Sequence, residues 1–280
     1  MQLELPAPAK INLFLHILGR RPDGYHELQS LFRFLELADT VSFELATEGI
    51  SVAMDRVSQE NNLVYKAAHI LSEGRDVPGV NVVVTKRIPL GTGLGGGSSD
   101  AATTLHGLNM LWELGLSDDE LAGLGLQIGA DVPVFVHGFT AFAEGIGERL
   151  APVDLPEAWY VVLVPESRIS TAEIFAHPDL TRDTSPITIA RFLQGEALRN
   201  DCERIVQRLY PEVGDALDWL SQQGTARMTG TGACVFLEAG DEAVARDILS
   251  QSNWQGFVSK GTKQSVLLDA LVQERNLFQN

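Results

Sequence analysis

The chain has 280 residues, of which 45% are hydrophobic and 21% charged, a composition that predicts a soluble globular enzyme of one large or two modest domains. Its formal net charge of −16, without any run of lysines or arginines, excludes nucleic acid as a partner but is compatible with a small anionic substrate, because a few cations can reverse the potential inside one cleft. The two cysteines, Cys202 and Cys234, and the lack of an apolar leader or a long apolar run predict a reduced, cytoplasmic protein without a membrane segment.

The first half of the chain is predicted to open with strands and to continue with helices. Strands are indicated by apolar residues at alternate positions or by β-branched runs, and helices by apolar residues three and four apart. The elements expected in chain order are strands over residues 3–17, 28–37, 41–45 and 80–84, and helices over 62–73, over 98–114 and from residue 117. Ser98, Ser99 and Asp100 are candidate cap and first-turn residues for the second helix, and Ser117 is the expected cap of the third.

A domain boundary is expected near Pro152 to Pro156, which divides the chain into residues 1–155 and 156–280. The second part mixes both kinds of element. Expected there are a strand over 159–164, helices over 189–199, 201–222 and 242–251, two strands around a glycine turn within 227–237, a strand over 256–259 and a C-terminal helix. The fold class predicted from these patterns is α+β, in two lobes.

A glycine-rich loop lies between the predicted strand over 80–84 and the helix that follows. Residues 91–97 read Gly-Thr-Gly-Leu-Gly-Gly-Gly, and Ser98, Ser99 and Asp100 come next. Glycine lets backbone N–H groups approach phosphate oxygens closely, and the start of the next helix offers its positive end to the same anion. The two serine hydroxyls add donors that could reach a phosphate or a bound Mg²⁺. The loop therefore predicts a phosphate site, with a purely structural glycine turn as the weaker alternative.

Three other glycine loops fit less well. The match Gly91-x-Gly93-x-x-Gly96 is that of a dinucleotide-binding loop, but the chain continues into a second helix where a parallel strand ending in an acidic residue would be needed. A Walker A loop would need a lysine where Gly97 stands, and the protein-kinase motifs are missing downstream. Charge neutralisation must therefore come from residues elsewhere in the chain.

Lys10 and Asp131 are the candidates for that chemistry. Lys10 is the only charged residue between Leu5 and Leu15, beside a predicted buried strand, and it could equally reach out to water from the strand end. Asp131 lies two residues before Pro133, where the local sequence favours a helix cap over a catalytic carboxylate.

The chain resembles the GHMP small-molecule kinases over nearly its whole length. Three blocks carry the resemblance, residues 8–13, 89–102 and 229–234. Residues 19–28, 129–135 and 142–148 are similar to those members whose acceptor is a cytidine-diphosphate sugar alcohol. One departure is Thr92, where such members usually have glycine or alanine; its branched side chain is expected to tighten the loop without abolishing binding.

The resemblance implies an N-terminal, ATP-binding lobe like domain 2 of ribosomal protein S5, a C-terminal ferredoxin-like lobe, and an active site in the cleft between them. It implies a kinase that uses ATP and Mg²⁺ and transfers a phosphoryl group to the 2-hydroxyl of its substrate. Asp131 would be the general base or orienting carboxylate, and Lys10 would lower the pKa of the alcohol and stabilise charge during transfer. The expected molecule is a monomer or weak homodimer.

The resemblance also assigns binding residues. Those expected around ATP are Pro89, Gly91, Gly93, Leu94, Gly95, Gly96, Gly97, Ser98, Ser99, Asn62, Leu63 and Asn109, and the Ser99 hydroxyl is a candidate ligand of Mg²⁺. Those expected around the substrate are Asn12, Tyr25, His26, Thr171, Phe175, Gly230, Thr231 and Gly232. Tyr25 and Phe175 would sandwich the cytosine ring, and His26 would hydrogen-bond its polar edge. Without the resemblance, a turn-packing tyrosine, a surface histidine and a core phenylalanine explain these three equally well.

Three other functions remain open from the sequence. A GHMP kinase for homoserine, mevalonate or galactose would not bind a cytosine, so competition by CMP separates it from the leading hypothesis. A nucleotide-binding module without catalysis is disfavoured by the presence of both Lys10 and Asp131. An oxidoreductase of the dinucleotide-binding class is the remotest, and a titration with NAD(P)H tests it.

Overall fold

The strands of the computed structural model, which describes residues 2–54, 62–195 and 199–278, join in one continuous sheet. They are β1 (Gln2–Arg20), β2 (His26–Ala46), β3 (Ile50–Met54), β4 (Gly79–Thr85), β5 (Ala141–Glu144), β6 (Arg149–Pro152), β7 (Ala158–Leu163), β8 (Ala226–Met228), β9 (Val235–Ala239) and β10 (Gly256–Thr262). The order across the sheet is β3-β4-β2-β10-β7-β9-β8, with β1 and β5 also paired to β2 and β6 paired to β5.

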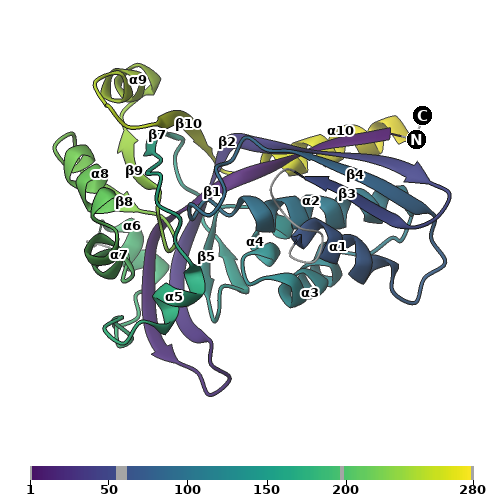
Figure 1. The fold of residues 1–280 in the computed structure, drawn as a ribbon, viewed down its shortest axis with the longest axis horizontal. Coiled ribbons are helices and arrows are strands. Elements are labelled where there is room, and N and C mark those ends of the chain that lie inside the picture. The colour runs from purple at the N-terminus through teal and green to yellow at the C-terminus, as the bar shows by residue number, and fades with distance from the viewer. Residues whose placement is uncertain (1, 55–61, 196–198, 279–280) are drawn as a thin grey trace.

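The helices pack around this sheet in two groups (Figure 1). They are α1 (Leu63–Ser72), α2 (Gly96–Leu111), α3 (Asp118–Ile128), α4 (Val132–His137), α5 (Thr171–Ala176), α6 (Ile189–Leu193), α7 (Glu203–Leu209), α8 (Pro211–Ser221), α9 (Glu242–Ser250) and α10 (Val266–Phe278). Helices α1 to α4 and α10 lie in one lobe, and α5 to α9 lie in the other. The mixed α+β architecture in two lobes is therefore confirmed.

A long antiparallel hairpin of β1 and β2 joins the two lobes. Its register runs from Gln2 opposite Glu44 to Arg20 opposite His26, and it shifts between Pro8 and Lys10 and again further along β1. The sequence indicated several shorter strands here, because such irregularities interrupt the alternation of apolar residues that marks a strand. In Figure 1 the hairpin runs past both groups of helices to a tip at the lower edge of the molecule.

Each lobe has its own hydrophobic core. The N-terminal core contains Leu5, Phe43, Leu105 and Phe135, and the C-terminal core contains Val161, Ile174, Val206 and Leu217. A third cluster lies where the lobes meet, with Ile11, Leu31, Phe142, Tyr160 and Phe236.

Packing crosses the predicted domain limits in two places. Leu267 and Leu271 of α10 belong to the N-terminal core, and Leu15 and Ile17 of β1 belong to the C-terminal core. The C-terminal helix thus returns to the first lobe, beside β1 (Figure 1). The division at residue 155 stays a prediction for the chain.

Three expected helices are corrected by the structure. The helix expected over 201–222 is two helices, α7 and α8, because Pro211 disfavours helical backbone at Tyr210, which has φ −129° and ψ 80°. The helix expected over 189–199 ends at Leu193, and residues 196–198 lie outside the described residues. Helix α2 begins two residues earlier than expected, with Gly95 at the cap position, so that Ser98, Ser99 and Asp100 follow in its first turns.

Other local signals are confirmed. Ser117 caps α3 and forms a reciprocal capping box with Glu120. Cys202 and Cys234 are buried free thiols.

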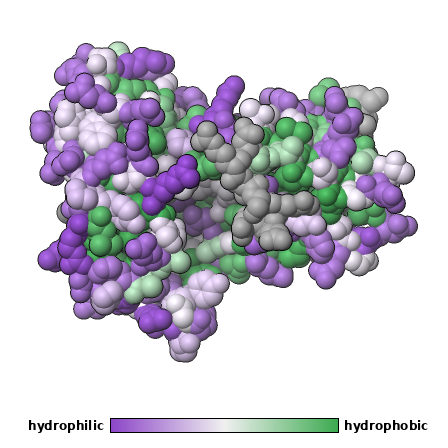
Figure 2. All heavy atoms as spheres, viewed as in Figure 1, coloured by the Kyte–Doolittle hydropathy of each residue, from purple (hydrophilic) through white to green (hydrophobic). Residues whose placement is uncertain are grey.

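Within the part of the chain that the structure describes, no helix combines the length and the apolar character that a membrane crossing requires. On the face seen in Figure 2, hydrophilic residues occupy most of the outline of the molecule.

Candidate active site

A cavity of about 710 Å³ lies between the glycine loop, the β1–β2 hairpin and the C-terminal lobe. Most of the residues predicted to bind ATP or substrate line it, although they come from positions throughout the chain. They are Lys10, Asn12, Tyr25, His26, Leu63, Pro89, Gly91, Gly93, Leu94, Gly95, Gly96, Gly97, Ser98, Asp131, Thr171, Phe175, Gly230, Thr231 and Gly232. A volume of this size suits one or more nucleotide-sized ligands.

The glycine loop requires its glycines for backbone conformation and for close approach. Gly91, Gly93 and Gly95 have φ of 71°, 81° and 76°, in the left-handed region that side chains disfavour. A Cβ at Gly95 would lie 2.6 Å from the Phe135 ring and 3.0 Å from Cε of Lys10. The loop therefore lies directly against the lysine, and α2 begins from it without a side-chain cap from the described residues. Backbone N–H groups at that helix start are suited to phosphate oxygens.

Lys10 is buried beneath this loop, with only 2% of its surface exposed, so the alternative of a lysine reaching out to water is excluded. Its Nζ donates to Oδ1 of Asn12 at 2.6 Å and to the carbonyl of Gly93 at 3.1 Å. The same atom lies 3.3 Å from Oδ2 of Asp131 and 5.3 Å from the centre of the Phe32 ring. A buried cation held by four groups can stabilise negative charge that develops beside it.

Asp131 stands at the cap position of α4, as the local sequence favoured, but its side chain makes no capping hydrogen bond. The carboxylate pairs with Lys10 instead and is 37% exposed, on the wall of the cavity. Its oxygens are therefore available to accept a hydrogen bond from a ligand hydroxyl, which is the geometry that a general base needs.

Asn12 is fixed in one orientation by its neighbours. Its Nδ2 donates to Oγ of Ser30 at 2.7 Å, and that hydroxyl donates onward to the carbonyl of Phe14 at 2.7 Å. The backbone N–H of Asn12 donates to Oγ1 of Thr229 at 2.9 Å. Because the amide nitrogen is engaged with Ser30, the amide oxygen faces Lys10.

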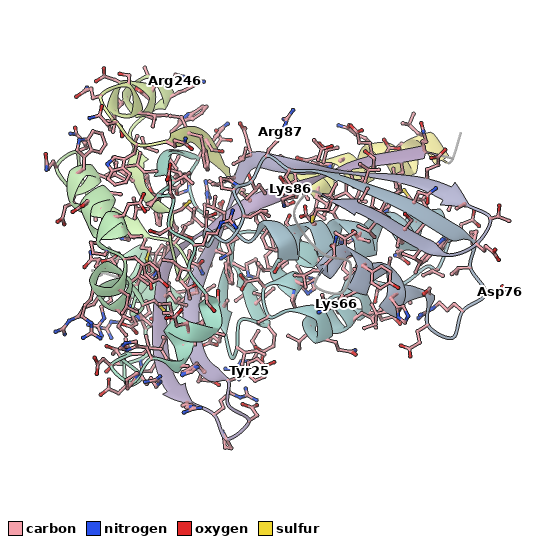
Figure 3. The ribbon with its side chains drawn as sticks, viewed as in Figure 1. Tyr25, Lys66, Asp76, Lys86, Arg87 and Arg246 are labelled. Carbon is pink, nitrogen blue, oxygen red and sulfur yellow. The ribbon has the colours of Figure 1, made fainter. Side chains whose placement is uncertain are left out.

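An aromatic group forms the other end of the cavity. Tyr25 lies in the turn between β1 and β2 and is 56% exposed, in the lower part of the molecule in Figure 3. The rings of His26 and Phe175 lie 5.1 Å apart and are inclined by 31°. Burial, together with the positive charges of Arg182 and Arg20, lowers the pKa of His26 below the usual 6.5. His26 is therefore neutral at physiological pH.

The third wall comes from α5 and the turn between β8 and β9. Oγ1 of Thr171 and Oγ1 of Thr231 lie within hydrogen-bonding distance, at 2.9 Å. Gly230 and Gly232 have φ of 56° and 87°. Nδ2 of Asn200 donates to the Gly230 carbonyl at 2.7 Å, which holds this turn against the cavity.

Three predicted ATP residues do not line the cavity. Asn62 is 2% exposed and caps α1 by accepting from the Val64 N–H at 2.9 Å. Asn109 donates to the carbonyl of Leu116 and accepts from its N–H, so its amide closes the loop after α2. Ser99 is fully buried, and its Oγ has no hydrogen-bond partner among the described residues. Their contacts with ATP or Mg²⁺ stay predictions that this geometry does not support.

Lys86 also lines the cavity, although the sequence did not indicate it as a site residue. Its Nζ lies between the buried carboxylates of Asp39 and Asp100, 2.7 Å from Oδ2 of Asp100. Burial raises the pKa of Asp100 to about 7, against the opposing effect of Lys86. The available signal was the position of Lys86 between the β-branched strand and Pro89, but nothing local indicated partners as distant as Asp39.

A metal-binding cluster of His, Cys, Asp and Glu side chains does not occur within residues 2–54, 62–195 and 199–278. The chain offers mainly backbone N–H groups, hydroxyls and Lys10 around the glycine loop. This donor set fits an anion better than a bare cation.

Comparison with protein families identifies the class. The model of the GHMP kinase N-terminal domain matches residues 62–139, and that of the GHMP kinase C-terminal domain matches residues 189–253. A solved mevalonate kinase shares the fold, with a TM-score of 0.66 over 94% of this chain and 100% of the other at 15% identity. The two-lobed fold with a glycine loop at the cleft is thus that of a GHMP kinase.

Closer relatives narrow this class. The 4-diphosphocytidyl-2-C-methyl-D-erythritol kinase of Marinobacter nauticus is 52% identical over 97% of this chain and 98% of its own length. The enzyme of the same name from Pseudomonas aeruginosa is 52% identical over 95% of this chain and 96% of its own length. A crystal structure of a 4-(cytidine 5'-diphospho)-2C-methyl-D-erythritol kinase is 33% identical, with a TM-score of 0.79 over 92% of this chain and 99% of the other. The chain belongs to the 4-diphosphocytidyl-2-C-methyl-D-erythritol kinase family of GHMP kinases.

Proposed function

We propose that this protein transfers the γ-phosphoryl group of ATP to the 2-hydroxyl of 4-diphosphocytidyl-2-C-methyl-D-erythritol, giving the 2-phosphate and ADP in the non-mevalonate route to isoprenoid precursors. Two relatives named 4-diphosphocytidyl-2-C-methyl-D-erythritol kinase, which are 52% and 49% identical to this chain over nearly the full length of both sequences, support the reaction. The observation that carries it in the structure is the Lys10–Asp131 pair, in one cavity with a phosphate loop at one end and an aromatic group at the other.

The donor end is proposed to bind the phosphates of ATP. The N–H groups of the glycine loop and of the first turn of α2 point their positive dipoles toward the anion, and Ser98 adds a hydroxyl at the cavity wall. Leu63 and Pro89 offer apolar surface to the adenine. Mg²⁺ bound to the phosphates would neutralise part of their charge, and the chemistry of the loop fits the phosphates of such a complex.

The reacting centre is proposed to lie at Asp131 and Lys10. The carboxylate of Asp131 accepts the proton of the 2-hydroxyl as the oxygen attacks the γ-phosphorus, and the ammonium of Lys10 stabilises the negative charge on that oxygen. Asn12, whose amide is held by Ser30, positions the lysine through its 2.6 Å hydrogen bond. Orientation of two bound substrates and electrostatic stabilisation account for most of the acceleration.

The acceptor end is proposed to bind the cytidine. Tyr25 and Phe175 present ring faces to the cytosine, and His26 presents a neutral imidazole to its polar edge. Thr171 and the turn of Gly230 to Gly232 line the path between the cytosine and Asp131. We expect the enzyme to act in the cytoplasm as a monomer or weak homodimer.

A coupled assay tests this function. Purified protein, ATP, Mg²⁺ and 4-diphosphocytidyl-2-C-methyl-D-erythritol should give ADP and a phosphorylated product in equal amounts, and CMP should compete with the acceptor. Homoserine and mevalonate, in its place, should give no product. Failure to form product across a range of pH and Mg²⁺ concentrations, or turnover of mevalonate without inhibition by CMP, would contradict the proposal.

A further inference from the structure

Arg182 lies behind the histidine of the cytidine pocket, in the segment after α5. Its Nε donates to Nε2 of His26 at 3.0 Å. The remaining guanidinium nitrogens are held by backbone carbonyls: Nη1 donates to Leu180 at 3.0 Å, and Nη2 donates to Phe175 at 2.9 Å and to His177 at 2.8 Å. The guanidinium is therefore fixed in place, with one N–H aimed at the imidazole.

This contact determines where His26 carries its proton. A guanidinium has N–H donors and no acceptor, so Nε2 of His26 must be the acceptor and must be unprotonated. A neutral imidazole then carries its proton on Nδ1. The second positive charge nearby, that of Arg20, further opposes the imidazolium form, in which both nitrogens would carry a proton.

The opposite edge of the His26 ring is free to meet a ligand. Nδ1 points away from Arg182, because the two ring nitrogens lie on different sides of the imidazole. Among the described residues Nδ1 has no hydrogen-bond partner, and His26 lines the cavity next to Phe175. The pocket therefore presents one N–H donor beside an aromatic face.

We propose that Arg182 is a positioning residue that fixes His26 as an Nδ1–H donor and thereby makes the pocket select cytosine over uracil; this rests on the function proposed above. N3 of cytosine is a bare acceptor and can receive the Nδ1–H. N3 of uracil carries a hydrogen, so two donors would face each other.

Uracil cannot be accommodated by a simple change of tautomer. If His26 moved its proton to Nε2 to accept the uracil N3–H, that proton would meet the N–H of Arg182, which the Phe175 and His177 carbonyls hold in place. One donor is left unpaired in either case. An unpaired buried donor corresponds to a preference for cytosine of roughly 10- to 100-fold.

The tautomer can be measured directly, without any ligand. Proton-coupled ¹⁵N spectra of the wild-type protein labelled at histidine, assigned with a His26→Asn variant, should place the His26 proton on Nδ1 at pH 7.5. In Arg182→Gln the signal should shift toward the Nε2–H tautomer that free imidazole prefers. A wild-type His26 protonated on Nε2, or on both nitrogens, would overturn the proposal.

Binding of CMP and UMP, measured by calorimetry, tests the selectivity. The wild type should prefer CMP by roughly 10- to 100-fold, Arg182→Gln should lose most of that preference, and Arg182→Lys, which keeps one donor, should retain part of it. Arg246→Gln is the matched control, since Arg246 pairs with Glu242 on α9 far from Tyr25 (Figure 3). If Arg182→Gln weakens CMP and UMP by the same factor, Arg182 only supports the loop and the proposal is wrong.

The two proposals fail in different ways. A wild-type enzyme that phosphorylates 4-diphosphocytidyl-2-C-methyl-D-erythritol but binds CMP and UMP equally would overturn only the role of Arg182. A wild-type protein with His26 protonated on Nδ1 that forms no phosphorylated product would overturn the kinase function and leave the tautomer assignment standing.

Discussion

Nζ of Lys10 and Oδ2 of Asp131 lie 3.3 Å apart, although Lys10 comes from β1 and Asp131 precedes α4. The lysine is buried and the carboxylate is partly open to the cavity. This asymmetry supports the two roles proposed above, in which the fixed cation stabilises charge and the accessible carboxylate receives the proton.

Replacement of the carboxylate should remove turnover and keep the fold. Asp131→Asn should lower kcat by about 10²-fold or more, with little change in KM for ATP, because the amide cannot accept the proton. Steady-state assays and thermal unfolding measure both effects. Asp119→Asn, in the first turn of α3 and 94% exposed, is the control. Turnover near that of the wild type in Asp131→Asn would return this residue to a structural role.

Removal of the buried cation should be at least as severe. Lys10→Met keeps much of the apolar stem but removes the ammonium that donates to the Asn12 oxygen and to the Gly93 carbonyl. We expect kcat to fall by roughly 10²- to 10³-fold, as for loss of one group that stabilises transition-state charge. Lys66→Met, on the exposed side of α1 (Figure 3), should change neither activity nor stability measurably. An active Lys10→Met enzyme would contradict the assigned role.

The glycine loop offers a matched pair of substitutions. Gly91→Ala and Gly95→Ala both place a side chain at positive φ, which costs on the order of 1 kcal/mol. A Cβ at Gly91 meets open space, whereas at Gly95 it meets the Phe135 ring and Lys10. Gly95→Ala should therefore weaken binding of an ATP analogue much more than Gly91→Ala does. If the two substitutions weakened binding of the ATP analogue equally in a titration, close packing of the loop against Phe135 and Lys10 would not be the reason for the glycine at position 95.

The ion pairs behind the loop should contribute to stability. Lys86→Met leaves Asp39 and Asp100 buried without their shared cation, which should lower the free energy of unfolding by about 3–5 kcal/mol. Chemical denaturation measures this difference. Arg87→Met removes the neighbouring, exposed cation, which is also labelled in Figure 3, and should be nearly neutral. A loss below 1 kcal/mol for Lys86→Met would contradict this assignment.

The pH dependence of stability should carry a signature of His26. Its pKa in the folded protein lies below the usual 6.5, so between these two values the unfolded chain binds more protons than the folded one. This contribution to the free energy of unfolding is therefore complete above pH 6.5 and is lost as the pH falls below it. Denaturation curves of the wild type and of His26→Asn at several pH values should diverge in that direction. A difference that grows as pH rises above 6.5 would contradict the sign.

Several features of the site were predictable because their signals are local. The glycine spacing of residues 91–97 indicated a binding loop, and this loop lines the cavity, although its contact with phosphate stays a prediction. Lys10 was recognisable as the only charged residue between Leu5 and Leu15. The cap position of Asp131 was also correct. Its missing capping bond was not predictable, since it depends on Lys10, which the fold brings there from β1.

The remaining features depend on contacts between distant segments. Arg182 is an ordinary arginine in its local sequence, and only the packing of its segment against β2 brings it to His26. The ion pair of Lys86 was not predictable for the same reason, because its partner Asp39 lies far away in the chain, on β2. The contact of Asn109 with ATP, which the resemblance suggested, stays a prediction, and in the structure both ends of its amide bond to the Leu116 backbone.

The position of the new phosphate on the product tests the proposed reaction most directly. Phosphorus and carbon NMR of the product formed from ATP and 4-diphosphocytidyl-2-C-methyl-D-erythritol should give one new phosphomonoester, coupled to the carbon at position 2, with one ADP for each product molecule. A phosphate on any other hydroxyl, or release of inorganic phosphate without a phosphorylated acceptor, would contradict the proposed roles of Asp131 and Lys10.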